Sequence, residues 1–226
     1  MIKNVVFLQQ NKMFKIDNYR KIQSEIENLE KNSQIIVVSK NHPKEAVELA
    51  LDYGVRIFGE NRVQEAKKKF SDLRLTFSDL ELHLTGPLQT NKVKDAIGIF
   101  DVFHTLDREK LAREFVKQEN LNNKKFFIQV NTGKEKNKSG IYLEELKGFI
   151  EYCRFDLKLN VVGLMCIPPI DDEPKKHFSI LAKAASENKL PQLSMGMSAD
   201  YIDAIKLNAN YIRVGTALFG ERKNEN

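Results

Sequence analysis

The sequence predicts a single α/β domain folded as a (β/α)8 TIM barrel, with an extra helix at its N-terminus. Apolar runs alternate along the whole chain with helical patterns, which is typical of a parallel sheet. Eight such runs follow one another at spacings of roughly 20 to 33 residues, as βαβ units do. A length of 226 residues matches one closed barrel with short loops. An open doubly wound sheet is the alternative, but no G-x-G-x-x-G turn follows the first apolar run.

The first predicted strand is the run from Ile35 to Val38. Four consecutive β-branched residues without polar alternation favour a strand that is covered on both faces. Apolar residues at helical spacing over 17–31 predict an amphipathic helix before it. Residues 1–14 are expected to form a flexible tail, with Met13 as an alternative start of translation, and 15–226 the barrel domain.

The remaining elements follow in strict alternation. Proline in the first turn and Gly54 just beyond the end mark the helix over 43–53. Further helices are predicted over 63–70, 91–96, 108–120, 143–155, 175–188 and 198–208. The strands between them are predicted over 55–59, 81–85, 102–106, 126–131, 159–167, 192–195 and 211–215.

Composition narrows the class of protein. A hydrophobic content of 42% supports a sizeable core, and no apolar run approaches the roughly 20 residues that span a bilayer. The net charge is +5, but the 36 Lys and Arg residues interleave with 31 acidic residues. This pattern favours solvated helix faces over a basic stripe that binds nucleic acid. The two cysteines, Cys153 and Cys166, have no disulfide or zinc-site spacing. We expect a soluble cytoplasmic protein without a metal site.

Polar residues gather at the carboxyl ends of the predicted strands, where barrel enzymes and binding proteins place their functional groups. The opposite ends are mostly apolar or carry ordinary charged residues. The carboxyl ends read Ser39-Lys40, Gly59-Glu60-Asn61, Gly86-Pro87-Leu88-Gln89, His104-Thr105, Asn131-Thr132-Gly133, Met165-Cys166, Ser194-Met195-Gly196 and Arg213-Val214-Gly215-Thr216.

The last two strand ends resemble a phosphate site. Each precedes a helical start, and barrels frequently bind phosphate between the loops after strands seven and eight. Gly215 permits close approach of the backbone, while Ser198 and Thr216 add hydroxyl groups. The alternative is that Ser198 is only a helix cap and Gly215 only a tight turn. Asp200, two residues after Ser198, disfavours an anion unless its carboxylate points away.

A lysine and a phosphate site on one barrel rim suit a phosphorylated aldehyde. The Lys40 amine is nucleophilic only when neutral, so its ordinary pKa of about 10.4 must be lowered by burial or by nearby cations. Arg213 and Lys138 are candidates for the nearby cations that would lower the pKa of Lys40. Lys40 could also simply mark the point where the first strand reaches the surface. We interpret His83 and His104 as barrel-interior histidines or acid-base groups, and Cys166 as a small buried hydrophobe.

Several motifs, in order and with similar spacing over about residues 17–222, resemble the pyridoxal phosphate homeostasis proteins, single-domain relatives of the alanine racemase N-terminal barrel. The motifs are Val37-Val38-Ser39-Lys40, Phe58-Gly59-Glu60-Asn61-Arg62-Val63-Gln64-Glu65, Gly86-Pro87-Leu88-Gln89-Thr90-Asn91-Lys92, Gln129-Val130-Asn131, Lys138-Ser139-Gly140, Gly163-Leu164-Met165, Leu193-Ser194-Met195-Gly196-Met197-Ser198 and Arg213-Val214-Gly215-Thr216-Ala217-Leu218-Phe219-Gly220-Glu221-Arg222.

The resemblance implies a barrel that holds pyridoxal 5′-phosphate as a Schiff base on Lys40. It places Arg213 at the pyridine nitrogen and Lys138 near the ring hydroxyl. Met165 would pack behind the ring, where racemases have a histidine. The implied cofactor-binding set is Lys40, Asn61, Lys138, Met165, Gly196, Ser198, Arg213, Gly215 and Thr216.

The resemblance also implies that the protein carries or buffers the cofactor without efficient catalysis and without catalytic residues of its own. An arginine at the ring nitrogen keeps that nitrogen unprotonated, which weakens the electron sink. The second domain that supplies an opposing tyrosine in racemases has no counterpart in this sequence. Apo-forms of pyridoxal phosphate enzymes are expected partners, and the protein is expected to be monomeric. An amino-acid racemase, a lysine-dependent aldolase and a nucleic-acid binder remain the alternatives.

Overall fold

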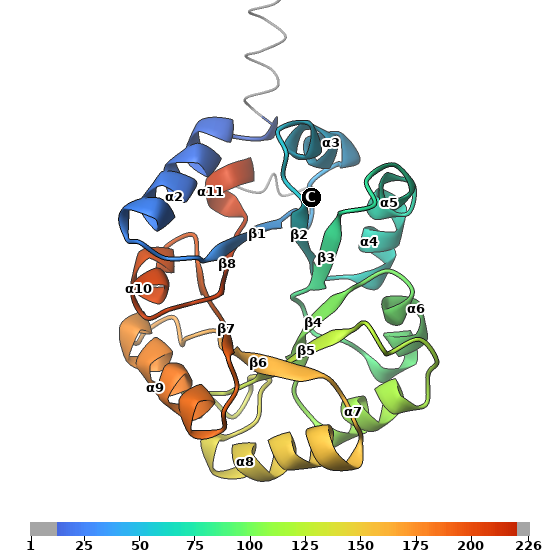
Figure 1. Cartoon of the computed structure of the whole chain (residues 1–226), viewed down its shortest axis with the longest axis vertical. Helices are drawn as coiled ribbons and strands as arrows, with labels where there is room; N and C mark the ends of the chain where they lie inside the picture. The colour runs from blue at the N-terminus through green and yellow to red at the C-terminus, as the bar shows by residue number, and fades with distance from the viewer. Residues whose placement is uncertain (1–12, 221–226) are drawn as a thin grey trace, which may run out of the picture.

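The computed structural model of the chain describes residues 13–220 and forms a closed barrel of eight parallel strands (Figure 1). The barrel closes where the first strand pairs with the last, with Ile36 opposite Arg213. This closure confirms the predicted (β/α)8 barrel and excludes the open sheet. The strands are β1 (Gln34–Val38), β2 (Ile57–Glu60), β3 (Glu81–Leu84), β4 (Val102–Leu106), β5 (Lys125–Gln129), β6 (Val161–Met165), β7 (Gln192–Met197) and β8 (Tyr211–Val214).

Helices surround the strands as an outer ring (Figure 1). They are α2 (Ile16–Asn28), α3 (Lys44–Asp52), α4 (Val63–Phe70), α5 (Leu73–Thr76), α6 (Val93–Ile97), α7 (Glu109–Val116), α8 (Leu143–Glu151), α9 (Pro174–Glu187), α10 (Tyr201–Lys206) and α11 (Thr216–Phe219). A short 3-10 helix, η1 (Thr90–Lys92), precedes α6, and a π-helical turn, η2 (Tyr152–Asp156), follows α8. The extra N-terminal helix predicted from the sequence is α2.

Of the predicted helices that are shorter in the structure, two lose the most residues. The helix predicted over 198–208 begins only at Tyr201, because the Asp200 carboxylate accepts a hydrogen bond from the Met197 N–H (2.6 Å) and holds residues 198–200 in a turn. The helix predicted over 108–120 ends at Val116, before a turn in which Asn120 has a positive φ of 67°. Periodicity alone did not locate either boundary, because the turn residues 117–120 and 198–200 are almost all polar and carry no apolar spacing.

The core has two layers, because successive strand residues point alternately into the barrel and out toward the helices. The outer layer includes Phe58, Phe103 and Phe126, all essentially inaccessible to solvent. The interior of the barrel is filled by the smaller cluster Ile36, Val38, Val102, Phe127, Met165 and Tyr211. The barrel interior is therefore packed with side chains, and the groups that a ligand can reach lie at the ends of the strands.

Helix α2 lies beside α11, so the two ends of the described chain meet on the outside of the barrel (Figure 1). Phe14 is fully buried, with its ring centroid 5.5 Å from that of Phe219. The Lys15 N–H donates to the Leu218 carbonyl oxygen at 2.7 Å. Phe14 is thus part of the packed barrel and not of the tail predicted over residues 1–14, and residues 1–12 of that tail lie outside the described residues.

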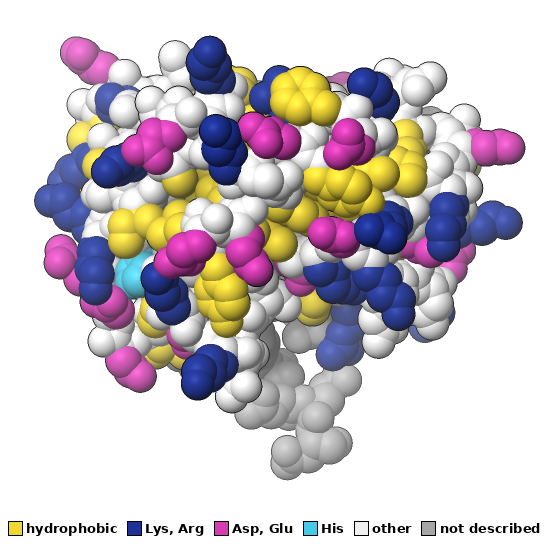
Figure 2. Space-filling view, turned by 90° about the horizontal axis from the view of Figure 1, so that it is seen from below, with side chains coloured by type: hydrophobic (Ala, Val, Ile, Leu, Met, Phe, Trp, Pro, Cys, Tyr) yellow, Lys and Arg dark blue, Asp and Glu magenta, His cyan; other side chains and the backbone are white. Residues whose placement is uncertain are grey.

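One side of the molecule carries side chains of both charges around a band of hydrophobic side chains (Figure 2). Lys and Arg stand among Asp and Glu on this face, as the interleaved sequence pattern predicts. No helix within residues 13–220 is both long enough and apolar enough to cross a membrane.

Candidate functional site

A cavity of about 320 Å³ opens at the carboxyl ends of the strands. It brings together groups that follow β1, β2, β3, β6, β7 and β8, which are far apart in the sequence. Six of the nine predicted site residues line it: Lys40, Asn61, Ser198, Arg213, Gly215 and Thr216. Its other lining residues are Val38, His42, Thr85, Ile167, Met197, Ala199 and Gly220.

Lys40 follows β1 and is held there by a buried polar network beneath it. The Ser39 hydroxyl donates to Glu60 Oε1 at 2.7 Å, and Lys69 Nζ donates to the same oxygen at 2.9 Å. Lys69 also donates to the Ser39 carbonyl oxygen at 2.7 Å. Burial raises the pKa of Glu60, although the neighbouring Lys69 ammonium acts against that rise. These contacts fix the backbone from which the Lys40 side chain extends.

Arg213 is a buried cation in the wall of the cavity. It lies in β8, with 5% of its surface exposed, and its two terminal nitrogens are both engaged. Nη1 donates to the Ser194 hydroxyl and Nη2 to the Cys166 carbonyl oxygen, each at 2.8 Å. Desolvation lowers the pKa of Arg213, but arginine remains charged in proteins. The guanidinium is thus held in one orientation.

The loops after β7 and β8 meet through Ser198, whose hydroxyl oxygen accepts a hydrogen bond from the Ala217 N–H at 3.3 Å. A hydroxyl that accepts one hydrogen bond can still donate its own proton. Gly215 lies so close to β1 that a Cβ on it would be 3.0 Å from the Val38 carbonyl oxygen. The Asp200 carboxylate accepts from the Met197 N–H and is not among the residues that line the cavity.

The described lining residues include the cationic side chains of Lys40 and Arg213 and no carboxylate. With the hydroxyl groups of Ser198 and Thr216, this set is rich in hydrogen-bond donors. The cavity therefore suits an anionic ligand with a hydrogen-bond acceptor near Arg213 and an electrophilic group near the Lys40 amine.

Three predicted site residues do not line this cavity. Met165 is fully buried inside the barrel. Gly196 lies within β7 with a positive φ of 89°, and a Cβ there would be 2.5 Å from the Ala204 side chain, so it is needed for the packing of α10. Lys138 is exposed and lines a neighbouring cavity of about 200 Å³, which shares Thr85 and Ile167 with the first.

Of the seven lining residues that sequence reasoning did not assign to the site, four have informative positions. Thr85, Ile167 and Met197 each stand at or just beyond the end of a strand, so the strand-end rule could have found them. Thr85 donates to Asn61 Oδ1 at 3.0 Å. The fourth, His42, stacks on Phe219 with ring centroids 4.6 Å apart, a contact between distant segments that no local pattern predicts.

The other candidates from the sequence lie inside the barrel. His83 and His104 are fully buried, and their nearest ring nitrogens are 2.7 Å apart. Neither lines the cavity, which agrees with the interpretation as interior histidines. Cys166 is fully buried, and burial raises the pKa of its thiol to about 12, so it is a small buried hydrophobe as expected.

Residues 16–223 match the family model for the alanine racemase N-terminal domain. The chain is 41% identical over 202 residues to the pyridoxal phosphate homeostasis protein of Aquifex aeolicus (strain VF5), an alignment that covers 84% of this chain and 88% of that protein. It is 37% identical over 201 residues to the protein of the same name in Escherichia coli (strain K12), covering 83% and 85%.

Among solved structures, the fold resembles PipY of Synechococcus elongatus PCC7942 with PLP bound. The TM-score is 0.78 and the identity 32%, with 90% of this chain and 99% of that chain covered. Alanine racemase from Corynebacterium glutamicum shares the fold, with a TM-score of 0.64 at 16% identity, covering 85% of this chain and 57% of that one. The family model and the curated relatives agree over most of the chain. This chain therefore belongs to the pyridoxal phosphate homeostasis proteins, which share the alanine racemase N-terminal domain.

Proposed function

We propose that this protein binds pyridoxal 5′-phosphate in the cavity at the strand ends, as a Schiff base on Lys40, and that it stores and delivers the cofactor without efficient catalysis of its own. The observation that carries the proposal is that Lys40, Arg213, Ser198 and Thr216 line one cavity. The names of the relatives and the PLP-bound PipY structure support it.

The lining residues fit the chemical groups of this cofactor. The Lys40 amine suits its aldehyde, and the Arg213 guanidinium suits the lone pair of its pyridine nitrogen. The hydroxyls of Ser198 and Thr216 suit its phosphate, and Gly215 allows the backbone to approach closely. Asn61 is a further polar lining residue. A volume of about 320 Å³ falls within the range of small-ligand pockets, roughly 300 to 1,000 Å³.

Weak catalysis follows from the same residues. When bound, the cofactor supplies an electron sink, which is strongest with a protonated ring nitrogen. Arg213 is a buried hydrogen-bond donor held by Ser194 and the Cys166 carbonyl, so it favours an unprotonated nitrogen beside it. The described lining residues also include no carboxylate or phenol that could act as acid-base partner to Lys40, and their one imidazole, His42, is stacked on Phe219. An amino-acid racemase is therefore the less favoured function.

The proposal has three further parts. The protein acts in the cytoplasm, as a monomer of one barrel domain, and apo-forms of pyridoxal phosphate enzymes receive the cofactor from it. Lys138 and Met165 lie outside the cavity, so they play no direct part in holding the cofactor.

The test is reduction of the protein with borohydride after incubation with pyridoxal 5′-phosphate, followed by peptide mapping. We expect the label on Lys40 and a loss of the visible absorbance band in Lys40→Ala. Lys138→Ala is the matched control, because it removes a lysine from the neighbouring cavity and should retain both the band and the label. A label on another lysine while Lys40 remains unmodified would overturn the proposal.

A further inference from the structure

A continuous row of polar side chains crosses the apolar interior of the barrel. It begins at Glu81, the first residue of β3, and ends at Arg213 in the cavity wall. Glu81 Oε1 is 2.8 Å from His83 Nε2, and His83 Nδ1 is 2.7 Å from His104 Nε2. His104 Nδ1 is 2.9 Å from the Ser194 hydroxyl, which accepts from Arg213 at 2.8 Å. Four hydrogen bonds thus join the two ends of the barrel.

Only one arrangement of protons satisfies the whole row while both histidines are neutral. The Glu81 carboxylate can only accept, so His83 carries its proton on Nε2 and its Nδ1 is an acceptor. His104 must then carry its proton on Nε2, which leaves its Nδ1 to accept the Ser194 proton. Arg213 can only donate, and it donates to Ser194. Every hydrogen bond therefore points the same way, from the guanidinium to the carboxylate.

The surroundings support neutral histidines in fixed positions. His83 and His104 are fully buried, and desolvation lowers the pKa of both imidazoles below the usual 6.5. The His104 ring stacks on Phe127, with centroids 4.6 Å apart and an interplanar angle of 8°. The Tyr211 ring lies in an edge-to-face arrangement with both imidazoles. The rings therefore have little freedom to turn away from their partners.

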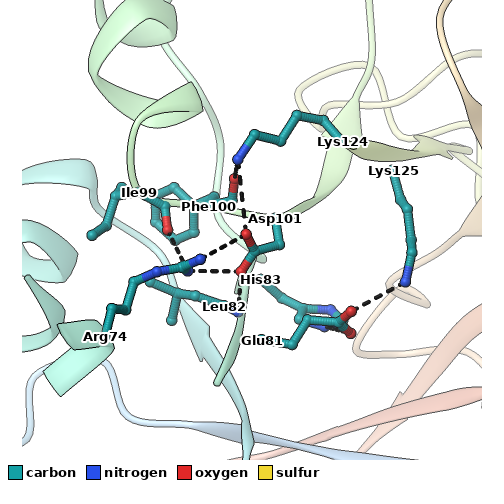
Figure 3. Close-up of polar contacts among 9 residues, drawn as sticks. All are labelled: Arg74, Glu81, Leu82, His83, Ile99, Phe100, Asp101, Lys124 and Lys125. Atoms are coloured by element: carbon teal, nitrogen blue, oxygen red, sulfur yellow. Dashed lines mark hydrogen bonds and ion pairs between the residues drawn. The ribbon is translucent and has the colours of Figure 1, made fainter. Parts of the chain in front are cut away.

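The far end of the row lies at the amino ends of the strands (Figure 3). There Glu81 is within hydrogen-bond distance of His83, and its second oxygen accepts from Lys125 Nζ at 3.1 Å. These contacts lower the pKa of Glu81 to about 2, so it is ionised at neutral pH. Asp101, bound to Arg74 at the same end, is a separate carboxylate outside the row.

We propose that Glu81, His83, His104 and Ser194 form a positioning chain that fixes the orientation of Arg213 in the cavity from the opposite end of the barrel. The inference rests on the proposed function in one respect: the Arg213 guanidinium is taken to face the cofactor ring. The chain gives Arg213 a partner whose lone pair is always directed at it, because the Ser194 proton is committed to His104.

The first test needs no cofactor. In the unliganded protein, nitrogen NMR of the imidazoles should show His83 and His104 neutral and protonated on Nε2. In Glu81→Gln an amide that can donate or accept replaces the carboxylate, so the chain loses its fixed direction. We expect shifts at both imidazoles and at the Arg213 side chain. Asp101→Asn, a change at the same end of the barrel, is the control and should leave His104 and Arg213 unchanged.

Two results of this test would overturn the proposal. One is a proton on Nδ1 of either histidine in the unmodified protein. This measurement decides the question even if Glu81→Gln fails to fold. The other is a response to Glu81→Gln that is confined to His83, since the effect of the substitution would then not reach Arg213.

The second test measures binding of pyridoxal 5′-phosphate. We expect its Kd to rise about 5-fold or more in Glu81→Gln, within the usual range of coupling between distant sites, and the absorbance band to shift. His104→Phe keeps the stack on Phe127 but cuts the chain, and should raise Kd about 10-fold. Asp101→Asn should stay within about twofold of the unmodified protein. Unchanged Kd and spectra in both chain variants contradict the proposal, whereas no binding by the unmodified protein contradicts the proposed function and leaves the NMR result to decide the chain.

Discussion

Lys69 Nζ donates a 2.7 Å hydrogen bond to the carbonyl oxygen of Ser39, the residue immediately before Lys40. The same ammonium donates to Glu60 at 2.9 Å and to Glu65 at 2.7 Å, so its three protons all have acceptors. Lys69 therefore joins α4 to the ends of β1 and β2. Its hydrogen bond to Ser39 fixes the backbone immediately before Lys40.

Replacing Lys69 with methionine should destabilise the fold strongly. The change leaves the fully buried Glu60 carboxylate without its cation, and loss of one partner of a buried ion pair costs about 3 to 5 kcal/mol. Lys67→Met on the same helix is the control, because the Lys67–Asp95 pair is about half exposed and should cost no more than about 1 kcal/mol. Urea denaturation gives both values, and equal costs would show that the buried pair is not the cause.

Sequence patterns predicted the order and type of the strands, because each βαβ unit repeats the same local signal. They predicted the strand over 102–106 and the helix over 63–70 with the bounds that the structure has. They could not predict the Lys69–Ser39 contact, since it joins residues 30 apart through a side chain that the sequence presents as one more lysine of a solvated helix face.

The site was predictable where a rule of position applies. Lys40, Arg213 and Thr216 stand at or near strand ends and line the cavity. Met165 also ends a strand, but its side chain points into the barrel, and only the strand register decides that direction. Lys138 lies in a loop whose path no local pattern specifies.

Gly196→Ala should destabilise the barrel, because Gly196 has a φ of 89° and an added Cβ would lie 2.5 Å from Ala204. We expect a loss of about 1 to 3 kcal/mol from the strained backbone alone. Gly148→Ala is the matched control: Gly148 lies in α8 with open space around its Cβ position, and alanine there should stabilise by about 0.5 to 1 kcal/mol. The midpoint temperature of thermal unfolding should therefore fall in Gly196→Ala and rise in Gly148→Ala.

The buried histidines should make stability fall on acidification below about pH 6.5. Burial lowers the folded-state pKa values of His83 and His104, so the unfolded chain binds more protons in this range. Each neutral imidazole adds a slope of at most about 1.4 kcal/mol per pH unit. The charged groups that act on the pKa of His83 are Glu81, Lys125 and Asp101, whereas His83 and Arg213 act on that of His104.

This slope is best read as the difference between the unmodified protein and His104→Phe. Burial raises the pKa of Glu60, so this group lowers the free energy of unfolding as the pH rises above 4.5, the usual pKa of a glutamate. Its contribution is the same in both proteins. Glu81, with a pKa of about 2, adds a loss below about pH 4.5 in both. Denaturant titrations from pH 7 to 5 should give a shallower slope in the variant, and parallel slopes would show that His104 is not neutral in the folded protein.

Thr216→Val and Ser198→Ala should weaken retention of pyridoxal 5′-phosphate more than they change its spectrum, because we propose that both hydroxyls hold the phosphate and not the conjugated ring. Each should cost about 1 to 3 kcal/mol of binding free energy, the range for a lost hydrogen bond to a charged group. Ser198→Ala also removes the acceptor of the Ala217 N–H, so its effect should be the larger. Equilibrium dialysis measures both, with Ser139→Ala in the neighbouring cavity as control; unchanged Kd in both variants would place the phosphate elsewhere.

The unmodified protein, loaded with pyridoxal 5′-phosphate, should exchange the α-proton of amino acids only slowly. Arg213 is fixed as a donor by Ser194 and the Cys166 carbonyl, so it disfavours the protonated ring nitrogen on which fast proton removal depends. Arg213→Glu should favour that protonation. Exchange should still stay slow, because the described lining residues of the unmodified protein offer no carboxylate or phenol as a second acid-base group and the His42 imidazole is stacked on Phe219. Deuterium incorporation into alanine in heavy water is the measurement, with Lys40→Ala as the blank. A rate at or above about 1 per second in the unmodified protein, within the ordinary enzyme range, would instead establish a racemase-like activity.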